Sequence, residues 1–237
     1  MWGHDFGQSS EGGVPLTPYS PPSSGTGGVF SSSNSPSVAL FVDYQNVYLV
    51  GKGQFRRPET RRSALLHPGR LADVIDSRRA ECHRPGRVTS VEVFRGQPGS
   101  SREPRSYARW QASASEWSRD RRVRVRGRPL RYPHDWPAGR AQEKGIDVLL
   151  AVSFVRAAIL RAADVLILAS RDTDLAPALE LALDMDDPPI VEVCNWSGRG
   201  RLSPHGRAPV WCTYLDESDF LSCLDPRDYR AAGGATA

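Results

Sequence analysis

The sequence predicts an α/β protein in which a mostly parallel sheet lies between two layers of helices. Two observations carry this prediction: β-rich segments alternate with helical segments from residue 38 onward, and the strongest strands are apolar along their whole length. Alternating strands and helices form parallel sheets that are covered on both faces, and buried strands of this kind lack a polar side. The three-layer α/β/α class follows, with functional residues expected beyond the carboxyl ends of the strands.

The first half of this alternation begins with the apolar run VALFVDY over 38–44. The polar, arginine-rich segment 50–67 is interpreted as a loop, and apolar residues at helical spacing predict a helix over 67–80. A strand is expected over 88–96. The segment 101–120 carries aromatic and small residues along one stripe and predicts an amphipathic helix. Alternation in RVRVRG predicts a short strand over 122–127.

The second half contains a strongly apolar helix over 141–160 and the most hydrophobic strand, ADVLILAS, over 163–170. Because VALFV and VLILA are the two most apolar strands, we expect them to be central and adjacent. The remaining elements are expected over 171–184 (helix), 189–196 (strand), 209–214 (strand) and 218–224 (helix).

Composition changes sharply near Ser37. Residues 1–37 are dominated by Gly, Ser and Pro and contain no Lys or Arg, which predicts a disordered tail; a short partner-binding motif around residues 15–22 is the alternative. We expect one domain over 38–225 and a flexible C-terminal tail over 226–237. The domain size suits a single core.

The bulk composition favours a cytoplasmic protein without membrane association. No run of 18 apolar residues and no basic segment followed by an apolar one is present, so neither a membrane span nor a secretory signal is expected. The four cysteines lack CxxC spacing and are interpreted as reduced thiols. The net charge of +4, carried almost entirely by arginine, is compatible with a nucleic-acid partner.

Acidic residues follow the two strands that are expected to be central. Asp43, with Asn46, follows the first strand, and Asp172 and Asp174 follow ADVLILAS. Carboxylates at one sheet edge repel each other unless they are protonated or bridged by a cation, and oxygen ligands of this kind suit Mg²⁺ or Mn²⁺. Asp147 adds a third carboxylate from an apolar helix, where Glu143 would share its face.

Each acid also has a purely structural interpretation. An Asp after a strand often forms a turn, as Asp43 would, or caps a helix, as Asp172 or Asp174 would near Leu175. Asp147 could be a solvated charge that is stabilised by the helix dipole. For all of them to be structural at once is a much weaker explanation than a shared metal site.

The combination FVDYQNVY (41–48), EKGIDVLLAV (143–152) and LILASRDTDLAPALE (166–180) resembles the NYN domain family of the PIN-like nuclease superfamily. The resemblance covers roughly 38–215 and implies a PIN-like, Rossmann-like topology. Members of the family carry an Asp and an Asn after the first strand, a Lys-x-x-Asp helix, and a Ser-x-Asp-x-Asp stretch after the fourth strand. All three motifs occur here in the same order.

The resemblance implies a metal-dependent ribonuclease that hydrolyses RNA phosphodiester bonds with Mg²⁺ or Mn²⁺. It assigns metal binding to Asp43, Asp147, Asp172 and Asp174, makes Asn46 a further catalytic residue, and places Ser170 at a carboxylate or the scissile phosphate. Two positions depart from the family pattern. Arg171 stands where Gly is frequent, and Ser153 stands where a second helical acid is frequent, which puts a second metal site in doubt.

Arginines and aromatic residues alternate over 102–131 and suggest an RNA-binding surface, because arginine contacts phosphate and exposed aromatic rings stack on bases. The alternative is a core position for the aromatic residues and a solvated face for the arginines. Zinc binding at Cys82 and His83 is disfavoured by the lack of clustered ligands. The residues predicted to contact single-stranded or structured RNA are Arg56, Arg57, Arg105, Arg109, Ser170 and Arg171.

Two other functions remain open from sequence. A catalytically weak NYN-fold protein could act as an RNA-binding or protein-interaction module, and Ser153 and Arg171 favour that possibility. A metal-dependent hydrolase of small phosphates is a third candidate, although the arginine-rich segment argues against it. The oligomeric state is also open, a homo-oligomer included.

Overall fold

A computed structural model describes residues 35–55 and 64–230. The predicted N-terminal tail therefore lies outside the described residues up to Asn34, as do Arg56, Arg57 and the predicted C-terminal tail from residue 231. Just before residue 231, the buried Tyr229 hydroxyl donates a hydrogen bond of 2.6 Å to Asp225.

Six parallel strands form one sheet with the order β3-β2-β1-β4-β5-β6. The expected central pair is confirmed, because β1 and β4 are neighbours in register from Val38–Val165 to Val42–Ala169. The strand order reverses between these two strands, and ligands bind at such switch points in open α/β sheets. The strands are β1 (Ser37–Asp43), β2 (Arg87–Gln97), β3 (Val123–Pro129), β4 (Val165–Ala169), β5 (Ile190–Trp196) and β6 (Trp211–Leu215).

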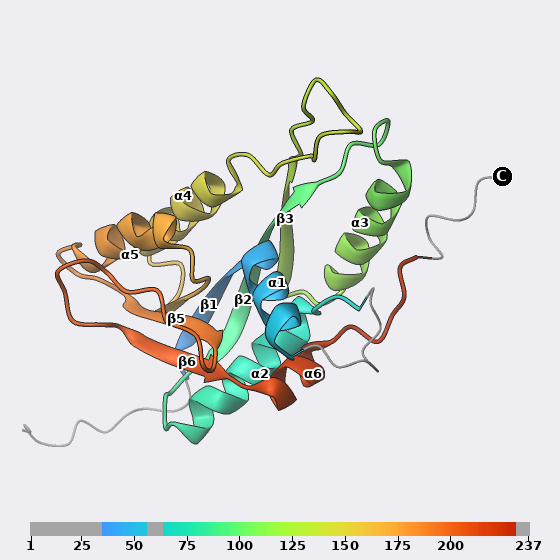
Figure 1. Cartoon of the computed structure of the whole chain (residues 1–237). Helices are drawn as coiled ribbons and strands as arrows, with labels where there is room; N and C mark the ends of the chain where they lie inside the picture. Colours follow the sequence, from blue (N-terminus) through green and yellow to red (C-terminus); the bar gives the residue numbers. More distant parts are fainter. Residues whose placement is uncertain (1–34, 56–63, 231–237) are drawn as a thin grey trace, which may run out of the picture. The chain divides into compact units, whose positions relative to one another are not determined.

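Helices cover both faces of the sheet, which confirms the three-layer prediction (Figure 1). One face packs against α1, α2, α6 and the end of α3, and the other against α4 and α5. The helices are α1 (Tyr44–Phe55), α2 (Pro68–Glu81), α3 (Pro104–Trp117), α4 (Ile146–Ile159), the 3₁₀ turn η1 (Thr173–Leu175), α5 (Ala176–Leu183) and α6 (Glu217–Cys223).

Strand alternation decides which side chains meet α4. In β1, Val38, Leu40 and Val42 pack in the α1/α2 core, whereas Ala39 and Phe41 pack in the α4/α5 core. Successive side chains point to opposite faces, so Asp43 follows Phe41 toward α4. By the same alternation Ser170 follows Leu168 of β4. The two polar residues therefore end two adjacent strands on the same face.

Two predicted boundaries are wrong, and both matter for the site. The segment 50–67 was expected to be a loop, but α1 runs to Phe55, and Gly51 packs so closely that an added Cβ would lie 2.8 Å from Trp196. The helix expected over 141–160 begins only at Ile146, after Gly145 in a left-handed conformation with φ 75°. Glu143 is therefore not on that helix.

All four cysteines, Cys82, Cys194, Cys212 and Cys223, are free thiols. Within residues 35–55 and 64–230, no helix has the length and apolar character that crossing a bilayer requires.

Candidate metal centre

Asp43 is the most buried acid at the switch point. It is the last residue of β1 and is only 4% exposed. Its Oδ2 accepts a hydrogen bond of 2.8 Å from the Ser170 hydroxyl, and its Oδ1 accepts one of 3.2 Å from the Asn46 backbone N–H. Burial raises the pKa of Asp43 to about 6, and the charges of Asp147 and Asp172 act in the same direction. A buried carboxylate beside two others favours a cation or a proton.

Asp147 lies close to Asp43 but belongs to α4, in the helix layer opposite α1. It lies in the first turn of α4, which begins at the carboxyl edge of the sheet. Its pKa is raised by partial burial and by the charges of Asp172 and Asp174. One oxygen of its carboxylate lies within 4.8 Å of carboxylate oxygens of Asp43 and Asp172.

Asp172 completes the group and also has a structural task. Its backbone N–H donates to Ser170 Oγ at 3.0 Å, and its Oδ1 accepts from the Asp174 N–H at 3.0 Å, as the cap of η1. The capping role that was considered for Asp172 is thus present. It occupies Oδ1, which still leaves Oδ2 of the carboxylate available for a metal.

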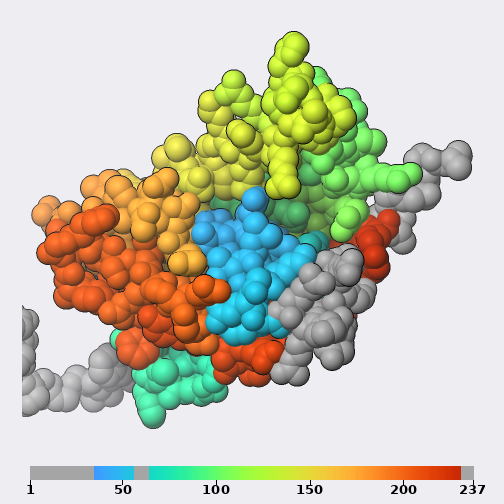
Figure 2. All heavy atoms as spheres, viewed as in Figure 1, coloured from blue at the N-terminus to red at the C-terminus, as the bar shows by residue number. Residues whose placement is uncertain are grey.

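One carboxylate oxygen from each of Asp43, Asp147 and Asp172 lies within 4.8 Å of the others. Hard divalent cations bind several oxygen ligands at once, at about 2.0–2.6 Å each, so three oxygens this close could share one ion. The donor set therefore fits Mg²⁺ or Mn²⁺. In Figure 2 the blue surface of β1 and α1 is bordered by the yellow surface near residue 145 and the orange surface beyond residue 175.

The other predicted residues hold different positions. Asp174 is exposed and is not among the three converging acids, although its charge reaches Asp147. Asn46 Oδ1 accepts from the Arg171 N–H at 3.3 Å, which joins the start of α1 to the loop after β4. Ser170 contacts a carboxylate, and the Arg171 residue is exposed.

Arg105 and Arg109 lie on α3, which packs on the sheet face opposite α4, away from the three acids. Of the aromatic residues in that region, Trp117 is fully buried in the core and Trp110 is half-buried. The core interpretation is therefore correct for Trp117.

A second group of arginines, most of them within the predicted RNA-binding segment 102–131, lies on the α4 side of the sheet. Arg124 and Arg126 of β3 pair in register with Glu92 and Phe94, and Phe94 packs against α4. The alternation in RVRVRGR therefore places Arg124, Arg126 and Arg128 on one face of an edge strand. This alternation can be read from the sequence. We call the hollow between β3 and α4 the arginine groove; its lining includes Arg121, Arg122, Arg124, Arg126, Ser153 and Arg156.

Arg128, beyond the groove on the same face of β3, lies nearer the acids. Its guanidinium is 3.7 Å from the place where a Cβ of Gly145 would stand, two residues before Asp147. Glu92 contacts Arg126 at 3.2 Å and partly offsets the positive charge. Ser153 lies in this groove, six residues or about 9 Å along the helix from Asp147. An acid at that position would face the arginines.

Fold and site together define an α/β protein with a Rossmann-like strand order and an acidic centre at its switch point. A sequence model of the NYN domain matches residues 37–186, and the chain belongs to this family of the PIN-like nuclease superfamily.

Among solved structures, a protein of unknown function from Vibrio parahaemolyticus is similar, with 16% identity and a TM-score of 0.47. The alignment covers 83% of this chain and 100% of that one. No curated protein matches this sequence.

Proposed function

We propose that this protein is a metal-dependent ribonuclease that hydrolyses phosphodiester bonds of RNA at the acidic centre. The observation that carries the proposal is the convergence of Asp43, Asp147 and Asp172, whose oxygens lie within 4.8 Å of one another at the switch point. Membership in the NYN family supports nuclease activity.

Mg²⁺ or Mn²⁺ would be held by Asp43 and Asp172, with Asp147 as the third ligand and Asp174 reaching the ion directly or through water. When bound, such an ion lowers the pKa of a coordinated water and neutralises charge on phosphate oxygens. The buried position of Asp43 gives this site a preference for a cation, because burial already disfavours the isolated carboxylate.

Three uncharged contacts position the ligands. Ser170 donates to Asp43 and accepts from the Asp172 N–H, so one hydroxyl orients two acids. Asn46 fixes the loop that carries Arg171, whose exposed side chain we propose contacts RNA phosphate. Groups that orient metal ligands in this way commonly change metal affinity by about 10–100-fold when they are removed.

RNA as the substrate is supported by the arginine groove. Alternate residues of a strand are about 6.6–6.8 Å apart, so Arg124, Arg126 and Arg128 can contact successive parts of a phosphate backbone that leads to the acids. Arg156 faces the same groove from α4. Arg105 and Arg109, on the opposite sheet face, would form a separate RNA-contacting surface, and Arg56 and Arg57 remain predicted contacts. We place the enzyme in the cytoplasm, where free thiols persist.

A non-catalytic RNA-binding module is the second candidate. The observation that favours it is the small size of the acidic centre, to which α4 contributes the single carboxylate of Asp147 among the described residues.

Cleavage of labelled single-stranded RNA by the full chain in Mn²⁺, Mg²⁺ or EDTA separates the two functions. We expect cleavage only with metal, and a loss of at least about a hundredfold in Asp43→Asn, on the scale of removing a charge-stabilising group. Asp187→Asn, an exposed acid whose side chain is 90% accessible, is the matched control. RNA binding without cleavage in the wild type would establish the module instead.

A further inference from the structure

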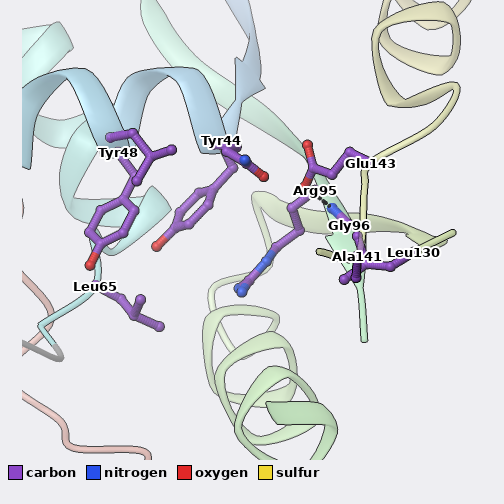
Figure 3. A pocket seen from close by; sticks show the side chains of 10 residues that line it. Tyr44, Tyr48, Leu65, Arg95, Gly96, Leu130, Ala141 and Glu143 are labelled. Atoms are coloured by element: carbon purple, nitrogen blue, oxygen red, sulfur yellow. Dashed lines mark hydrogen bonds between the residues drawn. The ribbon is translucent and has the colours of Figure 1, made fainter. Parts of the chain in front are cut away.

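A separate pocket lies next to the acidic centre, on the α1 side (Figure 3). Its volume is about 290 Å³, at the low end of small-molecule sites, which span about 300–1,000 Å³. Two links place it beside the acids: Tyr44 follows Asp43 directly, and the charge of Asp147 contributes to the raised pKa of Glu143. The side chains used below are Tyr44, Gln45, Tyr48, Leu65, Arg95, Leu130 and Glu143.

Arg95 supplies hydrogen-bond donors to this pocket. Its guanidinium lies 4.9 Å from the centre of the Tyr44 ring and 5.1 Å from that of Trp117. Its one hydrogen bond in the described part of the chain is a long one, 3.3 Å to the Ser113 hydroxyl. Since a guanidinium carries five N–H donors in a fixed fork, most of its donor capacity is left for a ligand with acceptor atoms.

Glu143 supplies acceptors at the other end. Its Oε1 accepts from the Gly96 N–H at 2.6 Å, a contact that depends on glycine because a Cβ there would lie 2.7 Å from the same oxygen. The exposed Gln45 amide, oriented with its nitrogen toward Glu143, donates to both carboxylate oxygens at 2.7 and 3.0 Å. Gln45 therefore marks the place where a ligand's N–H groups would be accepted.

The walls between these polar ends are flat or apolar. Tyr44 and Tyr48 are stacked with ring centres 5.9 Å apart, and their hydroxyls donate to the carbonyls of Leu66 and Ala64. Leu65 and Leu130 complete the lining. The pocket thus combines a donor fork, a carboxylate and ring-sized apolar walls, which are the groups that hold an unpaired base.

We propose that the pocket binds an unpaired guanine base of RNA next to the bond that is cleaved, an inference that rests on the proposed ribonuclease function. Guanine presents two adjacent acceptors, O6 and N7, which match an arginine fork. Its N1–H and N2–H donors match the carboxylate of Glu143. Adenine and cytosine carry an amino group, a donor, at the position where guanine has the acceptor O6. Uracil has a single N–H for the carboxylate. None of these bases therefore matches both the Arg95 fork and the Glu143 carboxylate as well as guanine does.

Binding without cleavage tests this directly. Fluorescence anisotropy would follow the full chain in EDTA with labelled oligouridylates of about ten nucleotides that carry one central guanosine, adenosine, cytidine, uridine or abasic site. We expect the guanosine oligomer to bind at least about fivefold more tightly than the uridine and abasic oligomers, a modest share of the effect of one stacked base. Arg95→Lys and Glu143→Gln should each remove that preference, whereas Arg207→Lys, on a distant loop, should retain it.

Equal affinity for the guanosine and abasic oligomers would overturn the proposal, as would a guanine preference that survives both substitutions. If Arg95→Lys fails to fold, Glu143→Gln decides alone, because it retains an oxygen for the Gly96 N–H. Cleavage is measured separately. A guanine preference without cleavage contradicts the ribonuclease but not the pocket, and cleavage without a base preference contradicts only the pocket.

Discussion

The Ser170 hydroxyl donates a buried 2.8 Å hydrogen bond to Asp43 Oδ2 and joins the carboxyl ends of β4 and β1. Strand alternation produces this contact, since both residues follow apolar side chains that face α4. The same hydroxyl accepts from the Asp172 N–H. One serine therefore sets the positions of two of the three converging acids.

Ser170→Ala is expected to weaken metal binding by about tenfold at neutral pH, the lower end of the range for groups that orient metal ligands. The hydrogen bond from Ser170 lowers the pKa of Asp43, so its loss makes the carboxylate harder to ionise. The Mn²⁺ concentration that half-saturates the protein measures the effect by calorimetry. Ser153→Ala, in the arginine groove, is the control. An unchanged Mn²⁺ affinity in Ser170→Ala would remove the positioning role.

Metal binding should also depend on pH. Because the pKa of Asp43 is about 6 in the metal-free protein, protons compete with metal below that value. The apparent Mn²⁺ affinity should be nearly constant above about pH 7 and fall about tenfold per pH unit below about pH 6. Calorimetric titrations across this range provide the check, and a flat profile down to about pH 5 would contradict the buried, shared position of Asp43.

Asp43→Asn is expected to stabilise the metal-free protein. The folded-state pKa of Asp43 is raised from 3.8 to about 6, so the folded state holds the proton more tightly. Its contribution to the free energy of unfolding is present below about pH 4, is lost as pH rises to about 6, and stays absent above. Two pK units correspond to about 3 kcal/mol at most.

Urea unfolding in EDTA measures this difference. At neutral pH, Asp43→Asn should exceed the wild type by about 1–3 kcal/mol and lack the decline between about pH 4 and about pH 6. If Asp43→Asn is less stable than the wild type and its stability depends on pH in the same way, Asp43 is a structural residue and not a metal ligand whose ionisation is disfavoured by burial.

The arginine groove and the neighbouring Arg128 should contribute to RNA affinity through charge. Within the described part of the chain, Arg128 and Arg156 have no ion-pair partner closer than 4.0 Å, so their removal leaves no described acid unpaired. For single strands each phosphate contact contributes about −0.7 to the slope of log affinity against log salt. Arg128→Ala combined with Arg156→Ala should therefore reduce the slope by about 1.4 without changing the maximal cleavage rate.

Anisotropy titrations of single-stranded RNA at several salt concentrations would measure that slope. Arg207→Ala, which removes an arginine paired with Asp184, is the matched control and should leave the slope unchanged. If both variants change it equally, the groove has no special part in binding.

Sequence was sufficient for the fold class and the core of the site because both depend on local patterns. The most apolar strands are central, and parallel strands bring the residues after them to one edge. This reasoning brings together Asp43, Asp172 and Asp174, and the apolar helix pointed to Asp147 as a third carboxylate. The NYN resemblance added a role for Ser170 at a carboxylate or the scissile phosphate.

Features that depend on distant contacts were not accessible. Two glycines and polar residues made 50–55 resemble a loop, but packing of Gly51 against Trp196 keeps it helical. Glu143 leaves the expected helix because it is bound to Gly96, 47 residues earlier. Glu192 stands in an apolar strand and is fully buried, but its partner Arg79 lies 113 residues away. No local pattern encodes these pairs.

A Mn²⁺ titration of the full chain, followed by electron paramagnetic resonance at neutral pH, tests the metal centre most directly. We expect one Mn²⁺ bound per chain, with binding lost in Asp43→Asn and strongly weakened in Asp147→Asn and Asp172→Asn. Asp174→Asn, outside the converging group, should weaken Mn²⁺ binding less than any of these three substitutions. Absence of bound Mn²⁺ in the wild type, or equal binding in wild type and Asp43→Asn, would contradict the assignment of these acids as a metal centre.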